Sequence, residues 1–194
     1  MHRLATSFVL GYHGCDRAVG ERLLAGEAFH PSDNEYDWLG PGVYFWEANP
    51  GRALDFARES LVRKRSEIKD PFVVGAVIEL GICLDLTTAA GTELVRTAYT
   101  SLLNIAAASA RKLPRNGPDY RRKNLDCAVL RRLHEILEDG GGAPVDTVKG
   151  IFTEGNPIYP GSGFFEKTHV QIAVRNLGSI KGVYRVPSDA LAAR

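Results

Sequence analysis

Apolar positions in this chain follow a strand-like pattern near both ends and a helical pattern between them. Short β-rich runs bounded by glycine, proline or polar residues are typical of buried strands. The run that begins at Phe72 predicts one long strand or two adjoining ones. The predicted strand segments are Phe8–Gly14, Val43–Trp46, Phe72–Leu86, Val148–Phe152, Thr168–Val174 and Ile180–Val186.

Two helices are predicted among the first strands. Asp16 can cap a short helix that Gly26 would end. Asn49 is a good N-cap and Pro50 a good first helical residue for the next one. Apolar residues that keep one face of this helix dry predict that it continues to Asp70-Pro71: Ala53, Leu54, Ala57, Leu61 and Ile68.

Residues 87–139 interrupt the strands with two helical periods, one from Leu94 to Ala108 and one from Leu125 to Ile136. The segment Leu113–Asp119 separates them, and Gly140–Gly142 ends the second. Strands, a helical insert and further strands predict a single α+β domain over residues 1–194, with the insert at about 87–139. The insert could shape a binding site, hold a partner or complete the core.

Composition narrows the classes of protein. The chain has 194 residues, 44% hydrophobic and 24% charged, with a net charge of +1, which excludes most disordered chains. No apolar run approaches the roughly 18 residues of a membrane span, and no secretory signal is visible, so no membrane association is expected. Three widely spaced cysteines support no disulfide framework and no metal site, and favour reduced thiols in the cytoplasm.

Positive charge gathers in one segment of this nearly neutral chain. Between Arg111 and Arg132 there are eight Lys or Arg residues and two Asp residues, with Tyr120 as the single aromatic. Such a segment could hold RNA, DNA or an acidic partner. A solvated helix face, partly neutralised by Glu135, Glu138 and Asp139, explains the charges equally well.

A set of short motifs appears in order along the first part of the chain. His13-Gly14 ends the first predicted strand, Gly40-Pro41-Gly42-Val43-Tyr44-Phe45 forms a turn and strand, and the helix capped by Asn49 follows. This order resembles the catalytic core of ADP-ribosyltransferases of the poly(ADP-ribose) polymerase type. The resemblance covers mostly the first 86 residues, with His169–Asn176 near the end. It implies a split β-sheet core and NAD as a co-substrate.

The resemblance also implies roles for individual residues. Gly14 would pair through its backbone with the nicotinamide carboxamide, and His13 would bond a ribose hydroxyl of the adenosine half. Tyr44 would stack on the nicotinamide ring. The expected reaction breaks the bond between nicotinamide and ribose through an oxocarbenium-like transition state.

The third family position, usually a glutamate on a late strand, matches Gln171 here. Strand alternation places Gln171 on the face opposite Val170 and Ile172, so it could line a cleft. A glutamine can orient a ribose but cannot ionise, which puts poly-chain elongation in doubt and leaves single transfer or NAD hydrolysis. Glu166 and Glu154, in the preceding loop, are candidate bases.

The helix after Tyr44 departs from the family as well. The family often places a small hydroxyl residue and a second stacking aromatic there. This chain has Arg52 near the first position, where a guanidinium could meet the pyrophosphate, and Phe56 near the second, where it could stack or join the core.

The expected function is therefore an NAD-dependent mono-ADP-ribosyltransferase that acts on a protein or nucleic-acid acceptor. A toxin-like role, with a neutralising partner protein, is a reading by family analogy alone. Two alternatives stay open: an RNA 2′-phosphate transferase of the same fold, and a non-catalytic module that binds NAD or ADP-ribose. A nucleic-acid-binding protein without NAD chemistry is a further, weaker alternative.

Overall fold

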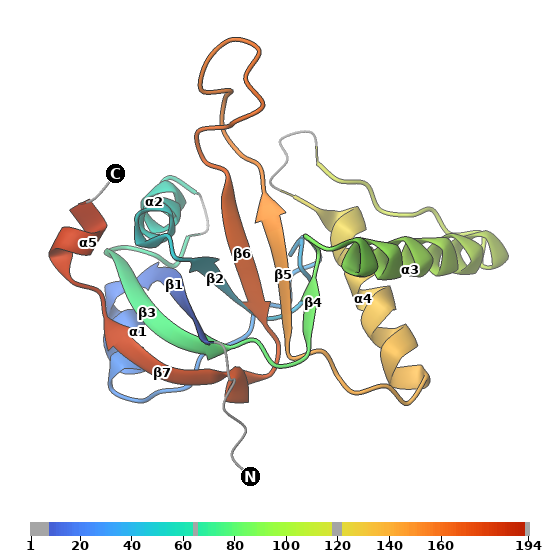
Figure 1. Ribbon diagram of the computed structural model, residues 1–194, viewed down its shortest axis with the longest axis horizontal. Coiled ribbons are helices and arrows are strands. Elements are labelled where there is room, and N and C mark those ends of the chain that lie inside the picture. The colour runs from blue at the N-terminus through green and yellow to red at the C-terminus, as the bar shows by residue number, and fades with distance from the viewer. Residues whose placement is uncertain (1–7, 64–65, 118–121, 193–194) are drawn as a thin grey trace.

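The structure, a computed structural model, describes residues 8–63, 66–117 and 122–192 and is of mixed α+β class, as the sequence predicts. Figure 1 shows the sheet with a pair of helices beside it. The strands are β1 (Phe8–Asp16), β2 (Val43–Glu47), β3 (Pro71–Glu79), β4 (Cys83–Asp85), β5 (Thr147–Phe152), β6 (His169–Val174) and β7 (Ile180–Arg185). The helices are α1 (Arg17–Leu24), α2 (Pro50–Ser60), α3 (Ala89–Ala108), α4 (Asn124–Asp139) and α5 (Ser188–Ala192), with a 3-10 turn at Leu177–Ser179.

The sheet is bent rather than flat. Its strand order is β4-β5-β6-β2-β1-β3-β7, so β3 and β4 are neighbours in the chain but lie at distant places in the sheet. In a flat sheet they would be about 24 Å apart, whereas the four Cα steps from Glu79 to Cys83 reach at most about 14 Å. The ladder between β1 and β2 contains two pairs, Gly11–Glu47 and Tyr12–Trp46, and marks the seam between the two halves.

The run from Phe72 to Leu86 therefore forms two strands in different halves of the sheet, the second of the two possibilities that the sequence left open. Gly81 makes the turn between them with φ of 57°. The Asp146 carboxylate accepts the Ile82 N–H at 2.9 Å, and Thr147 donates its hydroxyl to the Leu80 carbonyl at 2.6 Å. These bonds fasten the crossover to the start of β5.

Helix α2 packs on β1 and β3 and ends earlier than its apolar pattern predicts. Asn49 caps it by accepting the Arg52 N–H at 2.9 Å, as predicted, but the helix stops at Ser60 instead of Asp70-Pro71. Leu61 is 46% exposed. The chain must return to pair β3 with β1, and the Asp16 carboxylate draws it back by accepting the N–H groups of Lys69 and Asp70.

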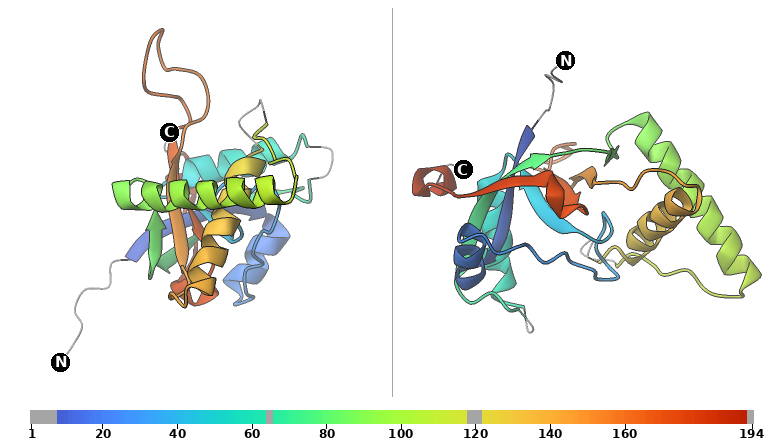
Figure 2. Two further views of the ribbon diagram at one scale, coloured as in Figure 1. Left: turned by 90° about the vertical axis from the view of Figure 1, so that its right-hand side faces the viewer. Right: turned by 90° about the horizontal axis from the view of Figure 1, so that it is seen from below.

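The insert completes the core of one half of the sheet. Leu130 and Leu133 of α4 are buried in one cluster with Leu39, Val148 and Ala173. Figure 2 shows α3 and α4 on the side of the sheet that carries β4 and β5. In the described part of the chain, no helix is both long and apolar enough to cross a bilayer.

Candidate functional site

A cavity of about 520 Å³ lies at the seam between the two halves of the sheet. Its walls come from β1, β2, β5 and β6, from α2, and from the segment between His30 and Trp38. Six of the residues singled out in the sequence line it: His13, Tyr44, Gln171, Arg52, Phe56 and Glu154. They come from positions as far apart as 13 and 171, so the fold alone brings them together.

His13, on β1, is held by β2 and keeps one ring nitrogen for the cavity. Its Nδ1 lies 2.9 Å from the Tyr44 carbonyl oxygen, and since a carbonyl only accepts, Nδ1 carries the proton. Burial lowers the pKa of His13, so the ring is neutral near pH 7. Nε2 has no hydrogen-bond partner among the described residues and is not a sealed atom, which leaves it as an acceptor facing the cavity.

Gly14 places backbone groups, not a side chain, at the seam. The Ala48 N–H donates to the Leu10 carbonyl at 2.9 Å, so the backbone groups of Leu10 face β2. Because that direction alternates along a strand, the N–H and C=O of Tyr12 and Gly14 face the same way. The ladder with β2 ends at Tyr12, so within the described residues Gly14 has no strand partner on that side.

Tyr44 is fixed on β2 by its phenol. The hydroxyl accepts the Leu39 N–H at 3.0 Å and donates to the Gly40 carbonyl at 2.9 Å. Burial raises the pKa of Tyr44 well above its usual value, so the phenol keeps its proton. These bonds hold the ring in one place beside the cavity.

Gln171, on β6, is buried with 9% of its surface exposed. Its Oε1 accepts the indole N–H of Trp38 at 2.6 Å. As predicted, Ile172 and Val174 turn to the core on the other face of the strand. His169, on the same face as Gln171, packs near the rings of Trp46 and Phe152.

Arg52 is a buried cation with spare donors. It is 8% exposed, and its Nη2 donates to Glu154 at 2.6 Å and lies 3.5 Å from Glu59. Its Nε and Nη1 are sealed from solvent and have no hydrogen-bond partner among the described residues. Buried donors of this kind are costly, and Arg52 lines the cavity, so its guanidinium could hold an anionic group if the sealed donors turned toward the cavity.

Aromatic rings cover the α2 side of the cavity. Phe56 lies against Trp46 with ring centroids 4.8 Å apart, and the Arg63 guanidinium lies 5.1 Å from the Phe56 ring centroid. Phe56 therefore packs on the core with one side and lines the cavity with the other.

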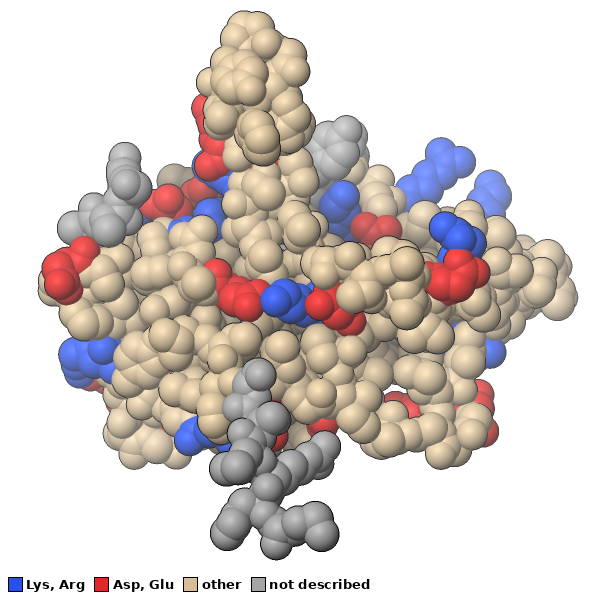
Figure 3. All heavy atoms as spheres, viewed as in Figure 1, with Lys and Arg blue, Asp and Glu red and all other residues tan. Residues whose placement is uncertain are grey.

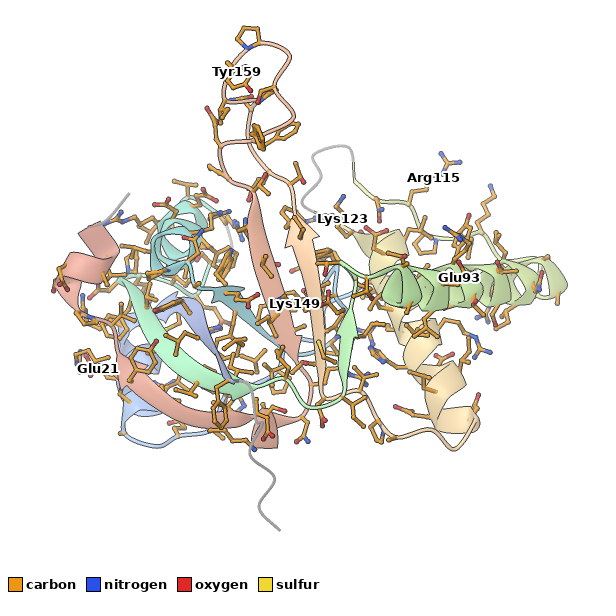
Figure 4. All side chains as sticks on the ribbon, viewed as in Figure 1. Glu21, Glu93, Arg115, Lys123, Lys149 and Tyr159 are labelled. Carbon is orange, nitrogen blue, oxygen red and sulfur yellow. The ribbon has the colours of Figure 1, made fainter. Side chains whose placement is uncertain are left out.

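Two of the predicted site residues, Gly14 and Glu166, do not line the cavity. Glu166 is exposed and holds the loop between β5 and β6, accepting the Asn156 N–H at 3.1 Å. That loop projects from the body, with Tyr159 at its far end (Figure 4). Glu154, at the base of the loop, is the carboxylate of this pair that reaches the cavity.

The basic segment divides into neutralised and exposed parts. Arg131 pairs with Asp33 at 2.5 Å and Arg132 with Glu135 at 2.9 Å. Three exposed cations have no ion pair with a described carboxylate: Arg111, Lys112 and Arg115. Asp119, Tyr120 and Arg121 lie outside the described residues.

One cation of the insert lines the cavity, and others project from the insert into solvent. Figure 3 shows Lys and Arg side chains projecting above α3 on the insert side, and Figure 4 labels Arg115 among them. Arg122 lines the cavity, with its guanidinium 5.8 Å from the Tyr36 ring centroid.

Sequence reasoning missed the aromatic wall supplied by Trp38, Tyr36 and Phe152. Tyr36 and Trp38 stand in the largely polar stretch Phe29–Leu39, which the sequence predicts to be a loop. Two large aromatics in a polar loop are a signal that could have found them, because exposed aromatic rings in such loops often contact ligands.

Comparison with known proteins adds a short segment of similarity. No protein-family profile matches the chain, and no solved structure matches it. An uncharacterized protein of Methanocaldococcus jannaschii is 42% identical over 36 residues. This stretch covers 19% of the present chain and 17% of that protein, so the chain aligns with a small part of its relative's length.

Proposed function

We propose that this protein is an NAD-dependent mono-ADP-ribosyltransferase with a core of the ADP-ribosyltransferase type. The observation that carries the proposal is the meeting of His13, Tyr44 and Gln171 in one cavity. Each comes from a different strand, and their order in the chain is that of the resembling family. The bent sheet with its seam between β1 and β2 supports the same assignment of fold.

The groups around the seam suit the parts of NAD. The backbone N–H and C=O of Gly14 face an unpaired side of β1, where they can pair reciprocally with a carboxamide. Nε2 of His13 can accept a hydrogen bond from a ribose hydroxyl. The Arg52 guanidinium lines the cavity and suits a pyrophosphate, which a guanidinium binds through parallel hydrogen bonds. The Tyr44 ring offers a flat surface to nicotinamide.

The reaction would break the nicotinamide–ribose bond and transfer ADP-ribose to an acceptor. Gln171 can orient a ribose but brings no negative charge to an oxocarbenium-like transition state. Glu154 is a candidate base, because it lines the cavity and is held by Arg52. We propose single transfer or hydrolysis of NAD, because Gln171 lacks the charge that chain elongation would use.

The acceptor is a protein or a nucleic acid, and the exposed cations of the insert favour an acidic one. A toxin-like role in the cytoplasm, with a partner protein that neutralises it, belongs to the same proposal. The second candidate function is a module that binds NAD without cleaving it. The uncharged side chain at Gln171 favours that alternative.

The test is mass spectrometry of NAD incubated with the purified protein, followed by a search for ADP-ribose on proteins and nucleic acids. Tyr44→Leu removes a cavity ring, and Tyr159→Leu is its control because Tyr159 is 55% exposed at the end of a loop. We expect nicotinamide release in the wild type and Tyr159→Leu, and its loss in a folded Tyr44→Leu. Bound but intact NAD would support the binding module instead, and absence of both would refute the proposal.

A further inference from the structure

The side-chain amide of Gln171 has two possible orientations, which exchange the positions of Oε1 and Nε2. An amide oxygen only accepts hydrogen bonds and an amide nitrogen only donates, so the orientation decides what the cavity offers to a ligand. We infer that Trp38 is a positioning residue that holds this amide in one orientation, with Nε2 presented to the cavity as a donor. The inference rests on the proposed function, since it assigns a task to Trp38 in the same site.

The hydrogen bond between the two side chains fixes the orientation. An indole N–H can only donate, so the atom 2.6 Å from Trp38 Nε1 has to be the oxygen of Gln171. The nitrogen, Nε2, has no partner among the described residues and is not among the sealed, unpartnered atoms. It therefore reaches the open cavity that Gln171 lines.

The fold makes room for Trp38 at this point. Gly150 of β5 lies directly opposite Gln171 of β6 in the sheet register. A Cβ added at Gly150 would lie 2.7 Å from Trp38 Cη2, so a glycine is needed for the indole to lie there. The ring of Phe152, two residues further along β5, also packs against the indole, with ring centroids 5.2 Å apart. The indole thus lies over one face of the paired strands β5 and β6, with its N–H directed at Gln171.

This arrangement defines the chemistry that the position accepts. A ligand atom facing Nε2 must be a hydrogen-bond acceptor, such as a ribose hydroxyl oxygen. A glutamate at this position would instead present an acceptor to the ligand. A carboxylate has two equivalent oxygens, so it would need no partner to choose its orientation.

That contrast gives a test based on two backgrounds. Trp38→Phe keeps most of the packing on Gly150 and Phe152 but removes the indole N–H. In the wild-type background we expect Trp38→Phe to lower kcat/KM for nicotinamide release from NAD by about 5- to 10-fold, which is the usual effect of losing one well-oriented hydrogen bond. In the Gln171→Glu background we expect the same change to cost less than about 2-fold, because the carboxylate cannot be misoriented. An equal loss in both backgrounds would assign Trp38 a packing role and overturn the inference.

A second measurement does not depend on turnover. The protein has two tryptophans, so its ¹H–¹⁵N spectrum has two indole signals to assign. Gln171→Leu removes the acceptor and should move the Trp38 indole proton upfield while leaving that of Trp46 near its place. An unmoved Trp38 signal would mean that the bond is absent and would overturn the inference. If NAD is neither bound nor cleaved by any variant but the Trp38 signal moves, the proposed function falls and the orientation of Gln171 stands.

Gly150→Ala provides a variant in which the indole N–H is retained but displaced. It should shift the Trp38 signal. Like Trp38→Phe, it is expected to lower turnover when residue 171 is glutamine but not in the Gln171→Glu background. Circular dichroism confirms which variants are folded before their rates are compared. A folded Gly150→Ala with the wild-type indole signal and rate would contradict the fit described for Trp38.

Discussion

His134, on α4, is a buried base, and in the part of the chain that the structure describes neither ring nitrogen has a hydrogen-bond partner. Burial and the nearby positive charge of Arg175 lower the pKa of His134 to about 4. The unfolded chain takes up this proton below about pH 6.5, whereas the native protein resists it until about pH 4. The free energy of unfolding is therefore unaffected by His134 well above pH 6.5, and it declines as the pH falls from about 6.5 to about 4.

We expect His134 to cost about 2 kcal/mol of stability between pH 7.5 and pH 5. Urea unfolding at the two pH values measures the change, and His134→Leu should remove this part of it. Burial lowers the pKa of His13 and His169 as well, so some acid sensitivity will remain in the variant. A pH response identical in the variant and the wild type would contradict the assignment.

Arg52 and Arg58 lie on the same helix in opposite surroundings, which makes them a matched pair. Arg52 is buried beside the cavity, whereas the side chain of Arg58 is 56% exposed. Arg52→Lys keeps the charge but loses the fork of donors, so one ammonium must serve both Glu154 and a phosphate. We expect NAD to bind about tenfold more weakly, a change of about 1.4 kcal/mol by calorimetry. Arg58→Lys should bind NAD as the wild type does, and equal effects would remove Arg52 from the proposed site.

At the level of elements, Gly14 controls how closely α2 approaches β1. A Cβ at this position would collide with the backbone carbonyl of Ala53, which cannot turn aside as a side chain can. Gly14→Ala should therefore cost about 1–3 kcal/mol of stability, the usual penalty of overpacking. Gly182→Ala, on the open surface of β7, is the control and should change stability by less than about 0.5 kcal/mol. Thermal unfolding compares the two, and similar losses would refute this account of α2 packing.

The sequence predicts elements well where a local signal agrees with the tertiary contacts. Asp16 and Asn49 cap their helices by accepting the Ala18 and Arg52 N–H groups, as their side-chain chemistry suggests. The end of α2 is different, because apolar residues continue past Ser60 while β3 pulls the chain away. Only the position of β3 beside β1 decides that end, and no local pattern contains it.

Some residues of the cavity can be predicted from short stretches of sequence, whereas others depend on contacts between distant parts of the chain. The motifs around His13 and Tyr44 are short stretches of sequence, and Gln171 follows from strand alternation. Trp38 joins them through a contact between residues 133 positions apart, formed across Gly150. Neither the bond nor the space for it can be seen before β5 and β6 are paired.

At the scale of the whole molecule, the insert and the sheet share one buried cluster. Leu133→Ala should cost about 2–5 kcal/mol, whereas Leu103→Ala, at a position 40% exposed, should cost about 1 kcal/mol or less. Far-UV circular dichroism follows mainly α3 and α4, while both tryptophans lie at the cavity. We expect the two signals to report one urea transition, in the wild type and in Leu133→Ala alike. Separate transitions would mean that the insert is an independent unit.

The short crossover from β3 to β4 also has a kinetic consequence. Residues 80–82 form a short connection between the two halves of the bent sheet, and hydrogen bonds to Asp146 and Thr147 hold it in place. The halves therefore cannot swing apart to let a molecule pass between them. A bound ligand is therefore expected to enter and leave through the open side of the cavity, whose lining includes Tyr36 and Glu154. The residence time of a ligand would then be set by its own contacts with the cavity wall, and not by any opening of the sheet.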